Sequence, residues 1–116
     1  MRRFNMFEDD EIRLRHILDA AREAVNFTEG QCRVDLDADR KLSLSLVRLL
    51  EIIGEAARGI TIEFRRKYSK LPWKSMIGMR DRLIHGYFDV NLDVVWETVA
   101  NDLPSLINKI EKIFTK

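Results

Sequence analysis

The chain is poor in residues that cross-link proteins or break regular structure. It contains one cysteine, Cys32, so no intramolecular disulfide can form, which is typical of proteins from a reducing cytosol. Only two prolines and five glycines occur among its 116 residues. No apolar run approaches the roughly 18 residues of a membrane span, and the first residues lack the apolar core of a signal peptide. We therefore expect one cytoplasmic, soluble domain over residues 1–116, without membrane contact.

The chain also lacks an excess of one charge and any cluster of metal ligands. The chain has 20 Lys and Arg residues against 19 Asp and Glu, a net charge of +1. Its overall charge therefore does not indicate a nucleic-acid partner. Neither of the two histidines, His16 and His85, has partners at metal-ligand spacing, and no glycine-rich phosphate loop occurs. We expect no metal and no cofactor.

What the sequence does contain is apolar residues at helical spacing along almost its whole length. The expected helices cover about residues 9–28, 39–64, 72–85 and 91–114. Asp9 or Asp10 is expected to cap the first helix. The fold class that follows is all-α, an up-and-down bundle of four or five helices.

Glycine, proline and acidic residues mark the irregular places in this pattern. Gly54 and Gly59 fall inside the second helix, where they indicate either close helix packing or a kink. Pro104 indicates that the last helix kinks or that two helices meet there. The acidic segment 29–39 has the composition of a turn.

The stretch MRDRLIHGYF, Met79–Phe88, lies at the end of the third expected helix. On a regular helix Arg80 falls in the apolar sector, and His85 lies roughly 140° away from it. An arginine in an apolar sector needs a carboxylate partner or a route to the surface, and Glu55 is one candidate partner. Alternatively, Arg80 lines a cleft in which a two-fold axis brings it near His85 of a second copy.

Charge is unevenly distributed around this stretch. Residues 63–82 contain seven basic and two acidic residues, a local net charge of +5. Residues 87–103 contain four acidic residues and no basic one. A basic segment of this kind suits phosphate backbones, although a solvated surface has the same composition.

Five short motifs together give the sequence a family resemblance. They are IIGEAA (52–57), LPW (71–73), IGMRDRLIHGYF (77–88), VVW (94–96) and NDLPSL (101–106). In this order they resemble the HepT-like branch of the HEPN superfamily, most clearly from Arg48 onward.

The resemblance implies a homodimer in which Arg80 and His85 cleave RNA without metal at the dimer cleft. Asp81 fits the polar position that follows the motif arginine, so it is a candidate supporting residue together with Glu55, the candidate partner of Arg80. The resemblance also implies the toxin of a type VII toxin–antitoxin system. Its antitoxin is a minimal nucleotidyltransferase that transfers AMP to the motif tyrosine, which is Tyr87 in this chain.

Other interpretations of the same residues remain open from the sequence. The protein can be a HEPN module that binds a nucleotide or a nucleotidyltransferase partner without cutting RNA. It can also be a helical interaction protein in which Arg80 forms a buried ion pair. Tyr87 can be a core aromatic residue, because its helical position falls in the apolar sector.

Overall fold

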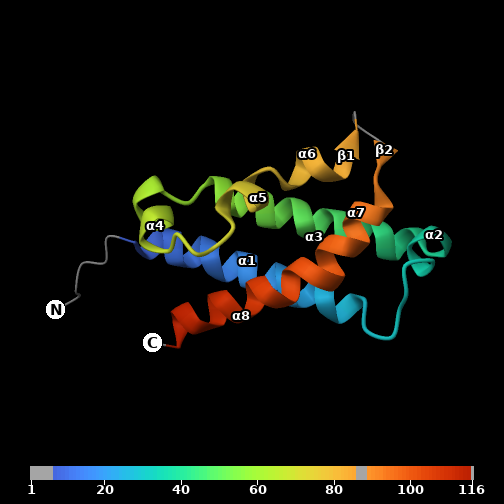
Figure 1. The fold of residues 1–116 in the computed structure, drawn as a ribbon, viewed down its shortest axis with the longest axis horizontal. Coiled ribbons are helices and arrows are strands. Elements are labelled where there is room, and N and C mark those ends of the chain that lie inside the picture. Colours follow the sequence, from blue (N-terminus) through green and yellow to red (C-terminus); the bar gives the residue numbers. More distant parts are fainter. Residues whose placement is uncertain (1–6, 86–88, 116) are drawn as a thin grey trace.

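A computed structural model describes residues 7–85 and 89–115, without the side chain of His85. This part of the chain is a helical bundle with one short antiparallel hairpin, as Figure 1 shows, so the expected all-α class is confirmed. The larger helices are α1 (Glu8–Phe27), α3 (Arg40–Arg58) and α8 (Leu103–Phe114). The shorter elements are α2 (Asp35–Ala38), α4 (Ile62–Lys67), α5 (Trp73–Ile77), α6 (Met79–Leu83), β1 (Ile84–His85), β2 (Asp89–Val90), α7 (Leu92–Glu97) and the π-helix η1 (Thr98–Asp102).

The core is built on the antiparallel pair α1 and α3, with α8 packed along α1 (Figure 1). Each helix contributes one apolar face with residues three or four apart, which is why the expected periodicity produces helices here. The fully buried side chains of these faces include Leu14, Ile17, Leu46, Leu50, Ile53 and Ile110. Each such side chain contributes roughly 1.5–3 kcal/mol to folding by leaving water. Within the described residues, no helix is both long and apolar enough to cross a membrane.

The second expected helix is shorter than its apolar pattern indicates. We expected a helix over residues 39–64, but α3 ends at Arg58 with Gly59 as its C-cap, and α4 starts after Thr61. Arg65 of α4 folds back and donates hydrogen bonds to the carbonyl oxygens of Ala57 (3.4 Å) and Arg58 (3.0 Å). These bonds add a side-chain donor to two carbonyl oxygens at the end of α3, so the turn is stable although the apolar spacing continues through it.

Asp10 has a different role from the one expected. Neither Asp9 nor Asp10 caps α1, whose N-cap residue is Phe7 and has no side-chain cap hydrogen bond. Asp10 is buried, with 3% of its surface exposed. Its carboxylate accepts hydrogen bonds from the backbone N–H of Thr61 (2.9 Å) and from the Thr61 hydroxyl (2.7 Å). It therefore fixes the start of α4 to the start of α1.

The acidic segment and the last helix also differ from expectation. Residues 29–39 are not only a turn, because they include α2. Between α7 and α8 the chain stays helical through η1, which ends two residues before Pro104. A proline has no N–H and its ring crowds the carbonyl four residues earlier. The wider π turn leaves room for the proline ring and does not need the missing N–H, so Pro104 lies in the first turn of α8.

Replacing Asp10 with alanine should lower the free energy of unfolding by about 1–2 kcal/mol, because the start of α4 loses both of its hydrogen bonds to the carboxylate. Chemical denaturation followed by circular dichroism measures this change. Asp9→Ala is the matched control, because Asp9 is the exposed neighbour in the same turn. Equal stability of the two variants would contradict the structural role of Asp10.

Candidate functional site

The element that carries Arg80 is a broken helix rather than a continuous one. We expected one helix over residues 72–85, but the helix is interrupted at Gly78 and ends at Leu83. The two short halves pack on α3 at Gly54, where a Cβ atom would lie 3.0 Å from the carbonyl oxygen of Met76. A side chain at this position would have to push the α5 backbone away, so of the two expected roles for Gly54 the close contact is correct.

The break changes which residues of this segment are buried. Met79 and Leu83 enter the core, with 3% and 0% of their surfaces exposed. Arg80, which we expected in the apolar sector, has 67% of its side chain exposed. The interpretation of Arg80 as a buried ion pair is therefore wrong.

The carboxylate nearest to Arg80 is Glu51 of α3, and not Glu55. Arg80 Nε lies 3.9 Å from Glu51 Oε2, a distance beyond hydrogen bonding. Glu55 instead accepts a hydrogen bond from Arg48 Nη1 at 3.2 Å. Because Arg80 is exposed and the two charged atoms are 3.9 Å apart, this ion pair contributes at most about 1 kcal/mol, and the Arg80 guanidinium can bind another anion at little cost.

Arg48 and Glu51 are members of the site that the sequence analysis missed. Arg48, Glu51 and Glu55 are spaced three and four residues apart, so they lie on one face of α3. That spacing was visible in the sequence, but the choice between the two glutamates depends on where α6 crosses α3. Asp81 is exposed on α6, next to Arg80.

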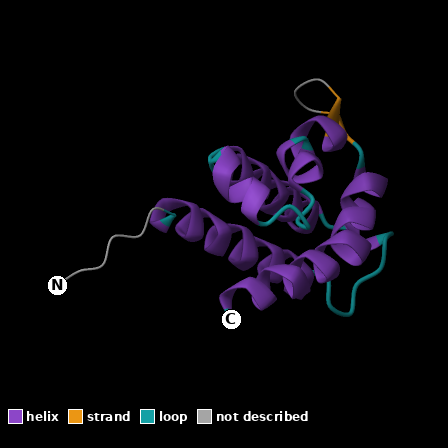
Figure 2. Ribbon diagram, turned by 60° about the vertical axis from the view of Figure 1, so that its left-hand side comes forward, coloured by secondary structure: helices purple, strands orange, loops and turns teal. Residues whose placement is uncertain are grey.

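The hairpin that follows α6 contains the rest of the predicted motif. His85 of β1 pairs with Asp89 of β2, and Ile84 pairs with Val90. The N–H of Asn91 donates to the carbonyl oxygen of Leu83 at 2.8 Å, which ties the base of the hairpin to α6. Figure 2 shows the two strands standing off the helical body. The expected helical position of His85 is therefore wrong, because it lies on a strand.

Two predicted site positions fall outside the described residues. They are the side chain of His85 and the whole of Tyr87. The structure therefore shows Arg80 at the base of the hairpin and leaves the proposed roles of the other two as predictions. Within the part of the chain that is described, no group of three or more His, Cys, Asp or Glu residues could hold a metal ion.

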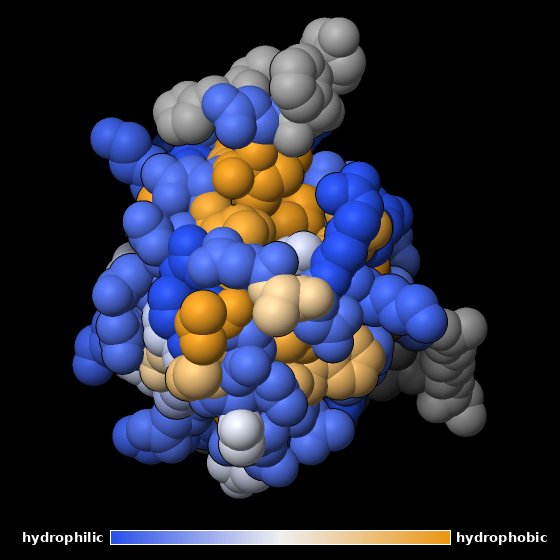
Figure 3. All heavy atoms as spheres, turned by 90° about the vertical axis from the view of Figure 1, so that its right-hand side faces the viewer, coloured by the Kyte–Doolittle hydropathy of each residue, from blue (hydrophilic) through white to orange (hydrophobic). Residues whose placement is uncertain are grey.

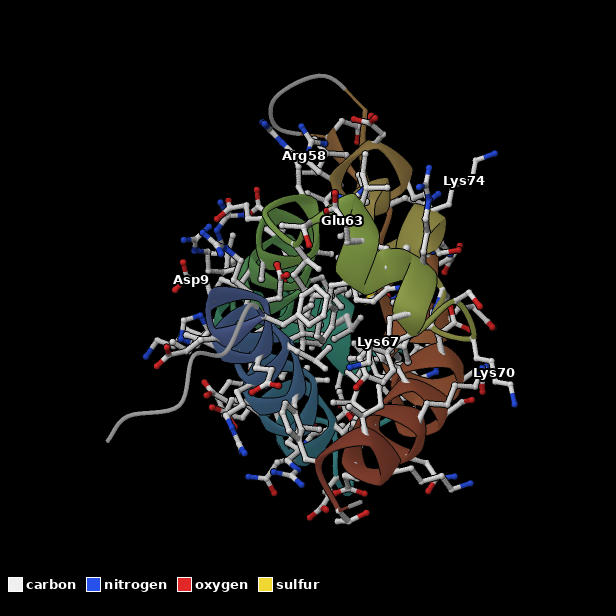
Figure 4. All side chains as sticks on the ribbon, turned by 90° about the vertical axis from the view of Figure 1, so that its left-hand side faces the viewer. Asp9, Arg58, Glu63, Lys67, Lys70 and Lys74 are labelled. Atoms are coloured by element: carbon white, nitrogen blue, oxygen red, sulfur yellow. The ribbon has the colours of Figure 1, made fainter. Side chains whose placement is uncertain are left out.

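The two charged segments meet beside α6, where Arg82 lies 3.9 Å from Asp102. The basic residues of α4 lie at the end of the bundle away from the hairpin (Figure 1), and Figure 4 shows Lys70 and Lys74 projecting outward. The acidic residues of α2 and the hairpin lie at the other end. There Arg33 bridges Asp93 (2.7 Å) and Asp37 (3.2 Å), and its hydrogen bond to Asp93 is the main cause that raises the pKa of the Arg33 guanidinium.

Apolar side chains gather at the acidic end, beside the hairpin. Figure 3 shows them on the face formed by α2, α7 and the strands. Leu44 at the start of α3 has 53% of its surface exposed, and Ile84, Val90 and Leu92 are half-buried. An accessible apolar surface of this kind beside charged residues is typical of a protein interface.

The comparisons with known proteins agree with the motifs. The family model described as ribonuclease HepT-like matches residues 17–113. The chain is 43% identical to "Putative RNase TTE0752" of Caldanaerobacter subterraneus subsp. tengcongensis, over 89% of this chain and 92% of the relative. It is also 43% identical to "Probable ribonuclease HepT" of Thermococcus cleftensis, over 86% and 91% of the two chains. No solved structure matches the chain significantly. The chain therefore belongs to the ribonuclease HepT-like family.

Proposed function

We propose that this protein is a metal-independent endoribonuclease, with Arg80 and His85 as its catalytic residues. The observation that carries the proposal is the position of Arg80. Its side chain is two-thirds exposed, weakly paired, and located at the base of the hairpin on which His85 lies. Family membership and the names of the relatives support ribonuclease activity.

The chemistry needs only these two side chains and RNA itself. The 2′-hydroxyl of the substrate attacks the adjacent phosphorus, and the bond from phosphorus to the 5′ oxygen breaks. A histidine, whose ordinary pKa is about 6.5, takes the proton from the 2′-hydroxyl and can return it to the leaving oxygen. Arg80 binds the phosphate oxygens as negative charge develops on them. Since DNA lacks the 2′-hydroxyl, the substrate is RNA.

The active form that we propose is a homodimer. The exposed face of α3 carries Leu44, Arg48, Glu51 and Glu55, and Arg80 lies beside it. With two cations and two anions this surface is neutral, so it can pair with its own copy about a two-fold axis. Such an axis near α6 brings Arg80 of one subunit toward the hairpin of the other.

We further propose that the protein is the toxin of a toxin–antitoxin pair and that Tyr87 is its control point. Tyr87 follows β1 by two residues, so it is close in sequence to His85. A minimal nucleotidyltransferase that attaches AMP to the Tyr87 hydroxyl would add a phosphodiester and a bulky base there. The negative phosphate would compete with RNA for Arg80, and the base would obstruct the cleft.

Light scattering at micromolar concentration should give the mass of a dimer. Leu44→Glu should shift the protein toward the monomer, because it places a charge in the proposed interface. Ile62→Glu is the control, since Ile62 is similarly exposed (57%) but lies on α4. A monomeric wild-type protein, or equal dissociation of both variants, would argue against this interface.

Arg80→Ala and His85→Ala should each reduce RNA cleavage at least about 100-fold, within the range expected for loss of one catalytic group. The helical circular dichroism spectrum should not change, because Arg80 is exposed. Cleavage of labelled RNA in the presence of EDTA measures the activity, and Arg22→Ala is a control at a surface ion pair. Inhibition by EDTA, or normal cleavage by His85→Ala, would refute the mechanism.

Incubation with the cognate nucleotidyltransferase and ATP should add AMP to Tyr87. Tyr87→Phe should keep its toxicity and escape this inactivation, because it has no hydroxyl to modify. The matched control is Tyr68→Phe, since Tyr68 is the other tyrosine of the chain. Mass spectrometry locates the added groups. Inhibition of an unmodified Tyr87 protein would point instead to control by complex formation.

A further inference from the structure

A second concave site lies on the opposite side of α6 from Glu51. It is a groove of about 330 Å³ between α5 and α6 on one side and η1 and α8 on the other. This volume lies at the lower end of the range for small-molecule sites. None of the residues proposed above for catalysis, modification or the dimer interface lines it.

The groove has an apolar floor. Met76, Met79, Leu103 and Leu106 form it, and each has at most 4% of its surface exposed. Methionine side chains are flexible and polarizable, so they adapt to the flat face of an aromatic group. The floor can therefore accept a planar, largely apolar ring.

The rim of the groove is polar and contains two cations. Arg82 of α6 and Lys109 of α8 line it together with Ser75 and Ser105. Asp102 is the acidic residue of the lining, and its carboxylate lies 3.9 Å from Arg82, beyond hydrogen bonding. The rim can therefore bind phosphate oxygens through the cations and hydroxyls, while Asp102 can accept a hydrogen bond from a base or a ribose hydroxyl.

Two further cations lie close in sequence to the residues of this rim. Lys70 and Lys74 are exposed, and neither forms an ion pair with a described residue. Figure 4 shows both projecting outward on the side of α5. Lys67, by contrast, lies over the rings of Phe7 (5.2 Å) and Tyr68 (5.5 Å). Lys70 and Lys74 therefore add accessible positive charge next to Pro72 and Ser75, which line the groove.

We propose that this groove binds one nucleotide of the RNA strand that is cut at Arg80, with its base on the methionine floor and its phosphates at Arg82 and Lys109. The inference rests on the proposed function. Arg80 and Arg82 are two residues apart on α6, so they point to opposite sides of that helix. A strand that passes over the exposed side of α6 can contact both, and the groove then selects the sequence flanking the cleavage point.

Two variants separate the groove from the cleavage site. Ser105→Trp fills the groove without changing its charge, and Lys109→Ala removes a rim cation without filling it. Each should raise the KM for a twelve-nucleotide RNA about tenfold, as expected for one lost charged hydrogen bond or one lost base contact. The KM for a dinucleotide, which is too short to occupy both sites, should rise much less, and the kcat for the long RNA should stay within about twofold.

The controls are matched residues of α8 that do not line the groove. Asn108→Trp introduces the same bulky ring, and Lys112→Ala removes the same charge one turn away. Both should behave as the wild type on either RNA. Equal KM values for the groove variants and their controls would overturn the inference while leaving the proposed ribonuclease intact.

A binding experiment tests the groove independently of catalysis. RNA that contains 4-thiouridine should crosslink to the His85→Ala protein within residues 72–82 or 98–109, and Ser105→Trp should suppress this crosslink. If the wild type cuts no RNA but the crosslink forms, the proposed function fails and the groove site stands. Crosslinks confined to other segments would overturn the groove site.

Discussion

The contact between Gly54 and the backbone of α5 determines where the functional residues lie. Because the helix surface at Gly54 has no side chain, the carbonyl oxygen of Met76 can approach to a position that a Cβ atom would obstruct. The two short helices then rest on α3 while their buried residues enter the core. Arg80 is left at the surface beside Glu51, and the hairpin begins directly after α6. Arg80 is thus exposed because α5 and α6 turn their apolar residues toward the core and leave Arg80 on the face that remains in solvent.

The sequence predicted the fold class and the first and last helices, because long amphipathic segments have a clear period. It gave a kink at Gly59 only as one of two alternatives and did not predict the break at Gly78. At both places the apolar spacing continues through a turn that is stabilised by contacts outside the helical pattern, namely the hydrogen bonds of Arg65 and the close packing at Gly54. The hairpin was missed because strands of two residues are too short to show alternation.

The sequence predicted which residues form the candidate site better than it predicted where they lie. The motif singled out Arg80, His85 and Tyr87, but an uninterrupted helix placed Arg80 in the core and His85 on a helical surface. Glu55 was named as one candidate partner of Arg80, but the turn of α3 that faces Arg80 carries Glu51. A sequence motif identifies which side chains form a site, whereas the positions of those side chains depend on glycine contacts that local spacing does not reveal.

The π turn of η1 amounts to one extra residue in an otherwise continuous helix from Leu92 to Phe114. On a regular helix Val95, Leu106 and Ile110 fall within about 60° of one another, so the apolar pattern runs in phase from α7 into α8. All three side chains are buried, which means that the chain passes the proline without losing its contact with the core.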